Sequence, residues 1–184
     1  MPNYGFIRNP LLTGYAHRRI RELEDTLSYR SDRLVDTRTG EPYQIDVPAN
    51  VSTDLASVPR LLWSVLAPCD VARAAIVHDY LYHRLWWDRH HHGEDRFWPL
   101  RRKLADQIFL DAMRWCDPPP PIWIRRACYR AVRLFGAREI RKAPAPEAVG
   151  KHVADLLPID HENRPLIGPK SLSHGRNGPP PHTS

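Results

Sequence analysis

The sequence predicts an α+β protein: a small N-terminal antiparallel β hairpin or sheet packed on a three-helix layer, followed by an extended C-terminal tail. Two changes along the chain support this class. Apolar residues alternate with polar ones before residue 50, and after residue 70 they recur at steps of three and four, which is the change from strand to helix periodicity. Proline then accumulates, since eight of the 19 prolines follow residue 142. We therefore expect one domain over residues 1–142 and a proline-rich tail over 143–184.

The strands are expected at about residues 27–50. Residues 27–31 and 43–47 alternate in polarity, and the residues between them are rich in turn formers around Gly40. An antiparallel hairpin that closes near Gly40 is the simplest interpretation. Pro48 should limit the second strand, because proline has no N–H to donate to the ladder.

Three helices are predicted at about residues 70–87, 99–116 and 122–138, each with one apolar stripe at helical spacing. Residues 88–93, which include three consecutive histidines, are expected to interrupt the pattern as a solvated loop. Adjacent histidines cannot all face one ion in regular structure, so this run is not the expected metal site. The prolines at 118–121 should end the second helix.

The composition limits the classes of function. The chain has 27 Lys and Arg against 21 Asp and Glu, a formal charge of +6, which suits an anionic partner without naming one. Six arginines between residues 125 and 141 make the third helix basic, and both a solvated face and a phosphate-binding face fit them. No nucleic-acid reading motif accompanies the charge, so nucleic acid is not an expected partner.

Export and membrane signals are also not expected. The N-terminus has no apolar leader segment, and no stretch approaches the roughly 20 apolar residues of a spanning helix. The three cysteines are widely spaced, which favours free thiols over a disulfide framework.

His78 is the strongest candidate for a functional side chain. It lies in the apolar stripe of the first predicted helix, where an imidazole needs a hydrogen-bond partner. If the first two helices pack antiparallel, Asp106 of the second helix meets His78 across the seam. Such a pair suits a general base, because the carboxylate fixes the tautomer while the imidazole takes a proton from water. A structural tie within the core would use the same pair, so both interpretations stay open.

A second candidate is a cation site that joins Asp54 to Asp79. Asp54 lies in a loop after the strands, and Asp79 lies about 100° around its helix from His78. Two carboxylates together with loop carbonyls offer the oxygen ligands that calcium prefers. On spacing alone, a turn that Asp54 or Ser57 caps is the simpler interpretation.

Three ordered motifs connect these residues with a known family. Residues 53–60 read TDLASVPR, residues 74–82 read AAIVHDYLY, and residues 105–109 read ADQIF. Together they resemble a domain of unknown function that is common in tailed bacteriophages and prophages, over roughly residues 27–136. The resemblance implies a phage or prophage origin, with the host cytoplasm during synthesis and then the virion as expected locations.

The same residues resemble the bacterial members of the secreted phospholipase A2 superfamily. Those proteins carry a calcium loop, then a His-Asp pair with a tyrosine four residues after the histidine, then a helix with an aspartate near a phenylalanine. The resemblance implies a catalytic dyad of His78 and Asp106, with Tyr82 in a structural role. It implies calcium ligands at the Asp54 side chain, a carbonyl near Leu55, and Asp79. The implied chemistry is hydrolysis of lipid esters, with His78 activating water and calcium stabilising the oxyanion.

Two classes of function follow from these observations. The first is a phage protein that acts as a calcium-dependent lipid ester hydrolase, with membrane lipid as its partner. The second is a non-enzymatic virion protein, a tail or head–tail component, whose residues 143–184 dock on other phage proteins. A segment with few large apolar groups gains order by lying on a partner, which favours the second class. Calcium dependence separates the two.

Overall fold

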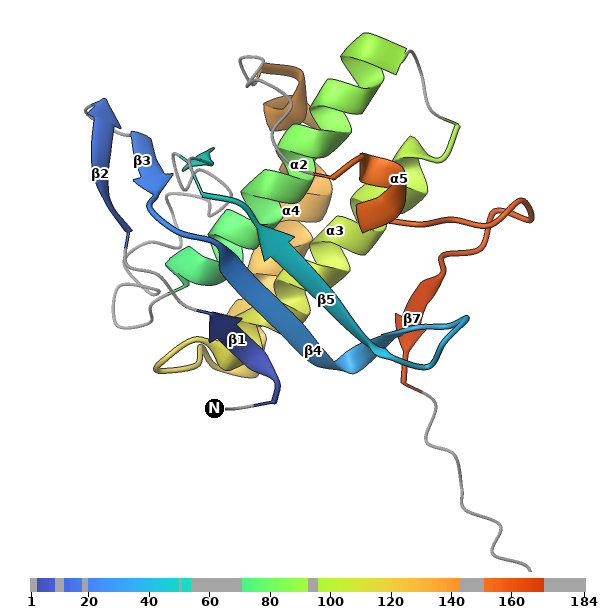
Figure 1. Cartoon of the computed structure of the whole chain (residues 1–184), viewed down its shortest axis with the longest axis horizontal. Coiled ribbons are helices and arrows are strands. Elements are labelled where there is room, and N and C mark those ends of the chain that lie inside the picture. The colour runs from blue at the N-terminus through green and yellow to red at the C-terminus, as the bar shows by residue number, and fades with distance from the viewer. Residues whose placement is uncertain are drawn as a thin grey trace, which may run out of the picture.

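The structure is a computed structural model, and it describes residues 3–8, 12–17, 20–49, 51–53, 71–92, 96–142 and 151–170. In chain order the elements are β1 (Gly5–Arg8), β2 (Leu12–His17), β3 (Ile20–Leu23), β4 (Leu27–Asp36), β5 (Pro42–Val47), β6 (Ser52–Thr53), α2 (Ala72–His92), α3 (Trp98–Ala112), the 3₁₀ turn η1 (Met113–Trp115), α4 (Ile122–Lys142), α5 (Val153–Leu156) and β7 (Ile167–Pro169). The fold is α+β, as the sequence predicts, with antiparallel sheet in the N-terminal part and the long helices after it (Figure 1).

The predicted hairpin is formed by β4 and β5. Tyr29 pairs with Ile45 in the antiparallel register of the two strands. Gly40 in the connecting turn has a φ of 73°, a left-handed conformation that glycine adopts at little cost. β5 ends at Val47, directly before Pro48, as expected from the missing proline N–H.

Further short strands surround the hairpin. β1 and β7 both pair with β4, β1 along its first half and β7 along Leu34–Asp36. β2, β3 and β6 form a second antiparallel sheet. These five strands are between 2 and 6 residues long. So short a strand contains too few alternations to be located from periodicity alone.

The three predicted helices correspond to α2, α3 and α4, and the first is longer than expected. α2 continues to His92, so the predicted interruption at residues 88–93 is wrong for 88–92. Two ring stacks explain the continuation, because Trp86 lies over His90 and Trp87 over His91, each with centroids 3.8 Å apart. Side chains four residues apart are neighbours on a helix, and their contact supports the last turns.

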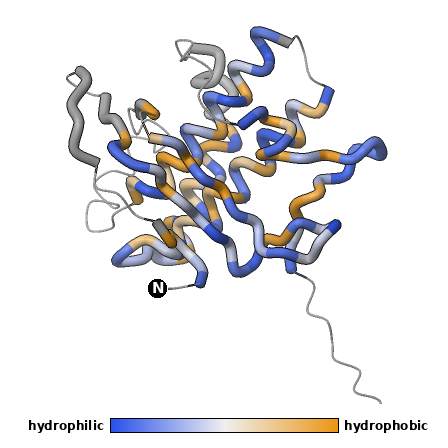
Figure 2. Tube along the Cα trace, viewed as in Figure 1, coloured by the Kyte–Doolittle hydropathy of each residue, from blue (hydrophilic) through white to orange (hydrophobic). Residues whose placement is uncertain are grey.

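The core lies between the hairpin and the helices. Buried apolar side chains come from both layers, among them Tyr29 and Ile45 from the hairpin, Ile76 and Leu81 from α2, Leu104 and Ile108 from α3, and Ile124 and Val132 from α4. Figure 2 shows hydrophobic residues recurring along the hairpin and along these helices. Within the described part of the chain, no helix combines the length and the hydrophobicity needed to cross a membrane.

Part of the segment expected to be an extended tail packs on this body. Residues 151–170 contain α5 and β7, and Val153, Leu157 and Ile167 are buried. The hydroxyl of Tyr43 donates a hydrogen bond to the carbonyl of Leu156 over 3.0 Å. The segment has too few apolar groups to fold alone, and it gains its order by lying on α2 and on the edge of β4.

Candidate functional site

The contact predicted between His78 and Asp106 is present in the structure. α2 carries the histidine and α3 carries the aspartate, and His78 Nε2 lies 2.8 Å from Asp106 Oδ1. His78 is 1% exposed and Asp106 is 0% exposed. The two helices therefore hold a direct histidine–carboxylate contact that bulk water does not screen.

The charge state of Asp106 fixes the tautomer of His78. Burial by itself raises the pKa of the Asp106 carboxyl, but hydrogen bonds from His78, Tyr82 and Arg133 outweigh burial and hold this pKa below its ordinary value. An ionised carboxylate only accepts hydrogen bonds, so Nε2 of His78 carries the ring proton and donates it to the bond. In a neutral imidazole of this tautomer, the second ring nitrogen, Nδ1, is the one that can accept a proton.

Tyr82 contacts the same carboxylate from one turn further along α2. Its hydroxyl donates to Asp106 Oδ1 over 2.5 Å, and its ring centroid lies 4.1 Å from that of His78. Burial and the neighbouring Asp106 charge raise the pKa of Tyr82, so the hydroxyl keeps its proton. Gly136 of α4 makes room for this hydroxyl, because a Cβ atom there would lie 2.6 Å from it. The contact is the one expected of a tyrosine that positions the aspartate.

Arg133 completes the set of donors to Asp106. Its Nη1 donates to Asp106 Oδ2 over 2.8 Å, and its side chain is 28% exposed. In the sequence, Arg133 is one of six arginines between residues 125 and 141 that make this helix basic, and its contact with Asp106 was not predicted. A usable signal was Gly136, three residues later on the same side of the helix, because a glycine inside a helix often marks a close approach.

Phe109 covers the imidazole from α3. Its ring centroid lies 4.8 Å from that of His78, and the side chain is fully buried. The predicted apolar stripe of this helix already contains Phe109. The aromatic ring excludes water from one side of the dyad, which strengthens the electrostatic interaction between His78 and Asp106.

Of the predicted calcium ligands, only Asp79 falls within the described residues. It follows His78 on α2, is 7% exposed and takes part in an interaction within the protein. Asp54 and Leu55 lie outside the described residues, so their convergence with Asp79 stays a prediction. Across the described ranges, no three His, Cys, Asp or Glu side chains gather as a metal site.

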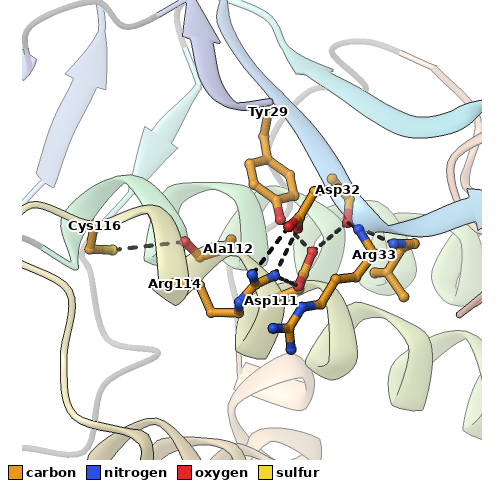
Figure 3. A network of polar contacts seen from close by, with 9 residues as sticks. Tyr29, Asp32, Arg33, Asp111, Ala112, Arg114 and Cys116 are labelled. Atoms are coloured by element: carbon orange, nitrogen blue, oxygen red, sulfur yellow. Dashed lines mark hydrogen bonds and ion pairs between the residues drawn. The ribbon is translucent and has the colours of Figure 1, made fainter. Parts of the chain in front are cut away.

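A second buried carboxylate lies five residues further along α3, at Asp111. Its Oδ2 accepts hydrogen bonds from the hydroxyls of Tyr29, over 2.7 Å, and Ser31 (Figure 3). Its Oδ1 accepts from Arg114 Nη1 over 2.9 Å. Arg114 also pairs with both carboxylate oxygens of Asp32, at 2.8 and 3.2 Å. This network ties β4 to α3 and η1, and no sequence pattern pointed to it.

The site around His78 can perform proton transfer. The orientation of the ring is fixed by Asp106, whose own position is fixed by Tyr82 and Arg133. A proton taken up at Nδ1 would give an imidazolium, which the ionised Asp106 stabilises across 2.8 Å. A histidine oriented by a carboxylate in this way is one part of a general-base arrangement.

One family model matches the chain. It is described as a protein of unknown function (DUF1353), and it matches residues 29–132. The matched region includes His78, Tyr82 and Asp106, whereas Arg133 lies one residue beyond it. No curated protein and no solved structure matches the chain.

Proposed function

We propose that this chain, which belongs to the DUF1353 family of proteins of unknown function, is a phospholipase-A2-like hydrolase of lipid esters. The observation that supports the proposal best is the arrangement around one carboxylate. His78 Nε2 lies 2.8 Å from Asp106 Oδ1, and the hydroxyl of Tyr82, one helical turn on, donates to the same oxygen. This is a histidine held in one tautomer with its basic nitrogen turned away from the carboxylate.

The reaction uses His78 as a general base. Nδ1 takes a proton from water as the oxygen of that water attacks the ester carbonyl carbon. The imidazolium is stabilised by Asp106 and then gives its proton to the leaving alkoxide as the ester bond breaks. One water is consumed, one acid and one alcohol are released, and His78 returns to its neutral form. General-base catalysis of this kind contributes roughly 100- to 10,000-fold in rate.

Calcium is part of the proposal. Asp79 offers a buried carboxylate beside His78, and together with Asp54 and a carbonyl near Leu55 it would give an all-oxygen set of the kind that calcium prefers. Bound there, calcium would supply positive charge for the oxyanion that forms on the ester carbonyl.

The biological setting is proposed from the motifs. TDLASVPR, HDYLY and ADQIF resemble a family common in tailed bacteriophages and prophages. They support a phage or prophage protein that is made in the host cytoplasm, is carried in the virion and acts on membrane lipid.

The burial of the dyad favours a second candidate function. At 1% and 0% exposure, His78 and Asp106 also suit a structural tie between helices. In that case the protein is a non-enzymatic virion component of the tail or the head–tail joint. It would dock on neighbouring subunits through the surface that residues 143–184 leave exposed, since residues 151–170 already pack on its own body.

Hydrolysis assays with matched histidine variants separate the two candidates. The wild type, His78→Ala and His161→Ala are incubated with mixed micelles of phosphatidylglycerol and detergent, with calcium or with EDTA. His161 is the control because its side chain is 87% exposed and remote in sequence from the dyad. We expect His78→Ala and EDTA each to lower the initial rate by about 100-fold or more, and His161→Ala to keep the full rate. A folded wild type that releases no fatty acid under any of these conditions contradicts the hydrolase and favours the virion component.

A further inference from the structure

α4 presents an exposed face that combines large apolar side chains with arginine. The exposed fractions are 56% for Ile122, 62% for Trp123, 72% for Leu134 and 55% for Phe135. No other large hydrophobic residue in the described part of the chain is exposed to this degree. A helix normally turns such side chains toward the core, and their exposure on one helix marks an interaction surface.

Arginines occupy the same face between the apolar residues. Trp123, Arg126, Arg130 and Leu134 follow one another at steps of three, four and four, so they form one stripe along the helix. Arg126 and Arg130 are exposed. Residues 122–136 contain four arginines and no acidic residue. The stripe spans roughly 16 Å, with a tryptophan near one end, a leucine near the other and positive charge between them.

We propose that this α4 face, which is centred on the stripe of Trp123, Arg126, Arg130 and Leu134 and has Ile122 and Phe135 at its two margins, docks the protein on an anionic membrane surface. Tryptophan, leucine and phenylalanine insert at the boundary between headgroups and acyl chains, and arginines on the same helix contact lipid phosphates. Long arginine side chains can reach the headgroups while their methylene stems lie along the apolar layer.

The charge pattern argues against other occupants of the face. A second copy of the chain, packed face to face, would bring Arg126 and Arg130 of both copies together with no carboxylate between them, and like charges in a dry interface cost several kcal/mol. A nucleic acid would satisfy the arginines but would leave the aliphatic Ile122 and Leu134 without a suitable partner. An anionic lipid surface satisfies both kinds of side chain.

Docking on this face does not require the contacts of the His78–Asp106 dyad to change. Arg133 lies about two turns after Arg126, at the margin of this face, but it is only 28% exposed and its guanidinium is held by the hydrogen bond to the buried Asp106. The helix can therefore lie on a membrane while it keeps its hydrogen bond to the buried carboxylate. The proposal does not depend on hydrolysis, and it holds for the hydrolase and for the virion component alike.

Vesicle binding tests the proposal. Full-length protein carrying His78→Ala, so that no lipid is consumed, is titrated with vesicles of phosphatidylglycerol and phosphatidylcholine in equal parts, and with pure phosphatidylcholine vesicles. We expect binding to the anionic vesicles that weakens as salt is raised. Arg126→Gln with Arg130→Gln should weaken it by roughly 25-fold, and Trp123→Ala with Leu134→Ala by about tenfold or more. The control, Lys151→Gln with Lys170→Gln, removes the same charge from exposed positions outside α4 and should bind as the parent does.

Several outcomes would overturn the docking proposal. They are no binding to anionic vesicles, equal binding to pure phosphatidylcholine, or binding that the α4 variants leave unchanged. A concentration-dependent dimer in sedimentation that Trp123→Ala with Leu134→Ala abolishes would make the face a contact between copies. Binding of a 20-nucleotide DNA that depends on Arg126 and Arg130, without vesicle binding, would make it a nucleic-acid surface. Because hydrolysis is not measured here, failure of the proposed reaction and failure of docking give separate results.

Discussion

Helix α3 carries two buried aspartates, Asp106 and Asp111, whose carboxylates accept hydrogen bonds from different kinds of side chain. Asp106 accepts hydrogen bonds from α2 and α4, whereas Asp111 accepts them from β4 and from Arg114. Each carboxylate receives a tyrosine hydroxyl and an arginine. The remaining donor differs, since it is the imidazole of His78 at Asp106 and the hydroxyl of Ser31 at Asp111.

That one difference decides what each network can do. A serine or tyrosine hydroxyl does not exchange its charge near neutral pH, so the Asp111 network is a fixed tie between sheet and helix. An imidazole can accept and release a proton in this range, and the carboxylate beside it stabilises the charged form. Of the two carboxylates, only Asp106 contacts an imidazole, and on this contact the proposed reaction depends.

The largest expected effect is on hydrolysis, and it should appear at one aspartate only. Asp106→Asn removes the negative charge that fixes the His78 tautomer, so we expect the rate of lipid hydrolysis to fall by roughly 100- to 10,000-fold. Asp111→Asn should keep the rate within a few-fold. Initial rates normalised to the folded fraction, measured by circular dichroism, make the comparison. Equal losses in the two variants would mean that the difference between the two networks does not matter for function.

In contrast to hydrolysis, the free energy of unfolding should fall by a similar amount when either aspartate is removed. Asp111→Ala leaves the buried hydroxyls of Tyr29 and Ser31 without their acceptor, and Asp106→Ala does the same to His78 and Tyr82. We expect each change to lower the free energy of unfolding by about 3–5 kcal/mol. Urea denaturation measures both. The control is Asp36→Ala at the end of β4, which should have a much smaller effect because this carboxylate is partly exposed and pairs with the exposed Arg38. A neutral Asp111→Ala would show that the tie between β4 and α3 is dispensable.

A smaller change in the free energy of unfolding is expected at Gly136, where α4 packs against Tyr82. In Gly136→Ala the new Cβ would lie 2.6 Å from Tyr82 Oη and 2.9 Å from Cε1, and Tyr82 is held by Asp106. We expect a cost of about 1–3 kcal/mol from overpacking, against a gain of about 1 kcal/mol from the better helix former. Tyr82→Phe in the same chain should recover part of the loss, because it removes the closest atom.

Thermal or urea unfolding of the single and double variants gives the coupling between positions 82 and 136. Gly168→Ala in β7 is the matched control, because its Cβ would meet only a methyl group of Thr37 at 3.2 Å. If the changes in the free energy of unfolding of the two single variants simply add up in the double variant, the packing explanation is wrong.

Periodicity predicted the parts of the molecule that depend on local sequence. The alternation around Tyr29 and Ile45 gave the hairpin, and the apolar stripes gave the helices and the contact between His78 and Asp106. Arg133 could not be selected in this way. It is one of several arginines along α4, and only the packing of α4 on Tyr82 decides which of them turns toward the carboxylate.

The segment after residue 150 shows a second limit. Residues 143–184 contain eight prolines and few large apolar residues, so composition predicted an extended tail. The burial of Val153, Leu157 and Ile167 comes from contacts with distant elements, such as the pairing of β7 with β4. Asp111 was missed for a related reason. A single aspartate in an amphipathic helix looks like a solvated position until β4 places two hydroxyls beside it.

The smallest expected effect is on how the free energy of unfolding depends on acid pH. It compares the contribution of the buried Asp106 with that of the partly exposed Asp32. The pKa of Asp106 is lowered although burial raises it, because three donors favour the charged form. The pKa of Asp32 is lowered mainly by its hydrogen bond from Arg114. A group with a lowered folded-state pKa stabilises the fold above its unfolded pKa, about 3.9 for aspartate. That stability is lost as the pH falls through the folded-state value.

The free energy of unfolding should therefore be higher for wild type than for Asp106→Asn at about pH 5 and above. The difference should shrink below about pH 4, as the wild type loses the same charge by protonation. Asp32→Asn should show the same pattern with a smaller gap, because Asp32 is partly exposed and depends on one arginine. Urea titrations at pH 7, 5, 4 and 3 measure all three proteins. A gap for Asp106→Asn that already closes between pH 7 and pH 5 would mean that another group titrates, and that the ionised Asp106 is not what holds the helices α2, α3 and α4 together.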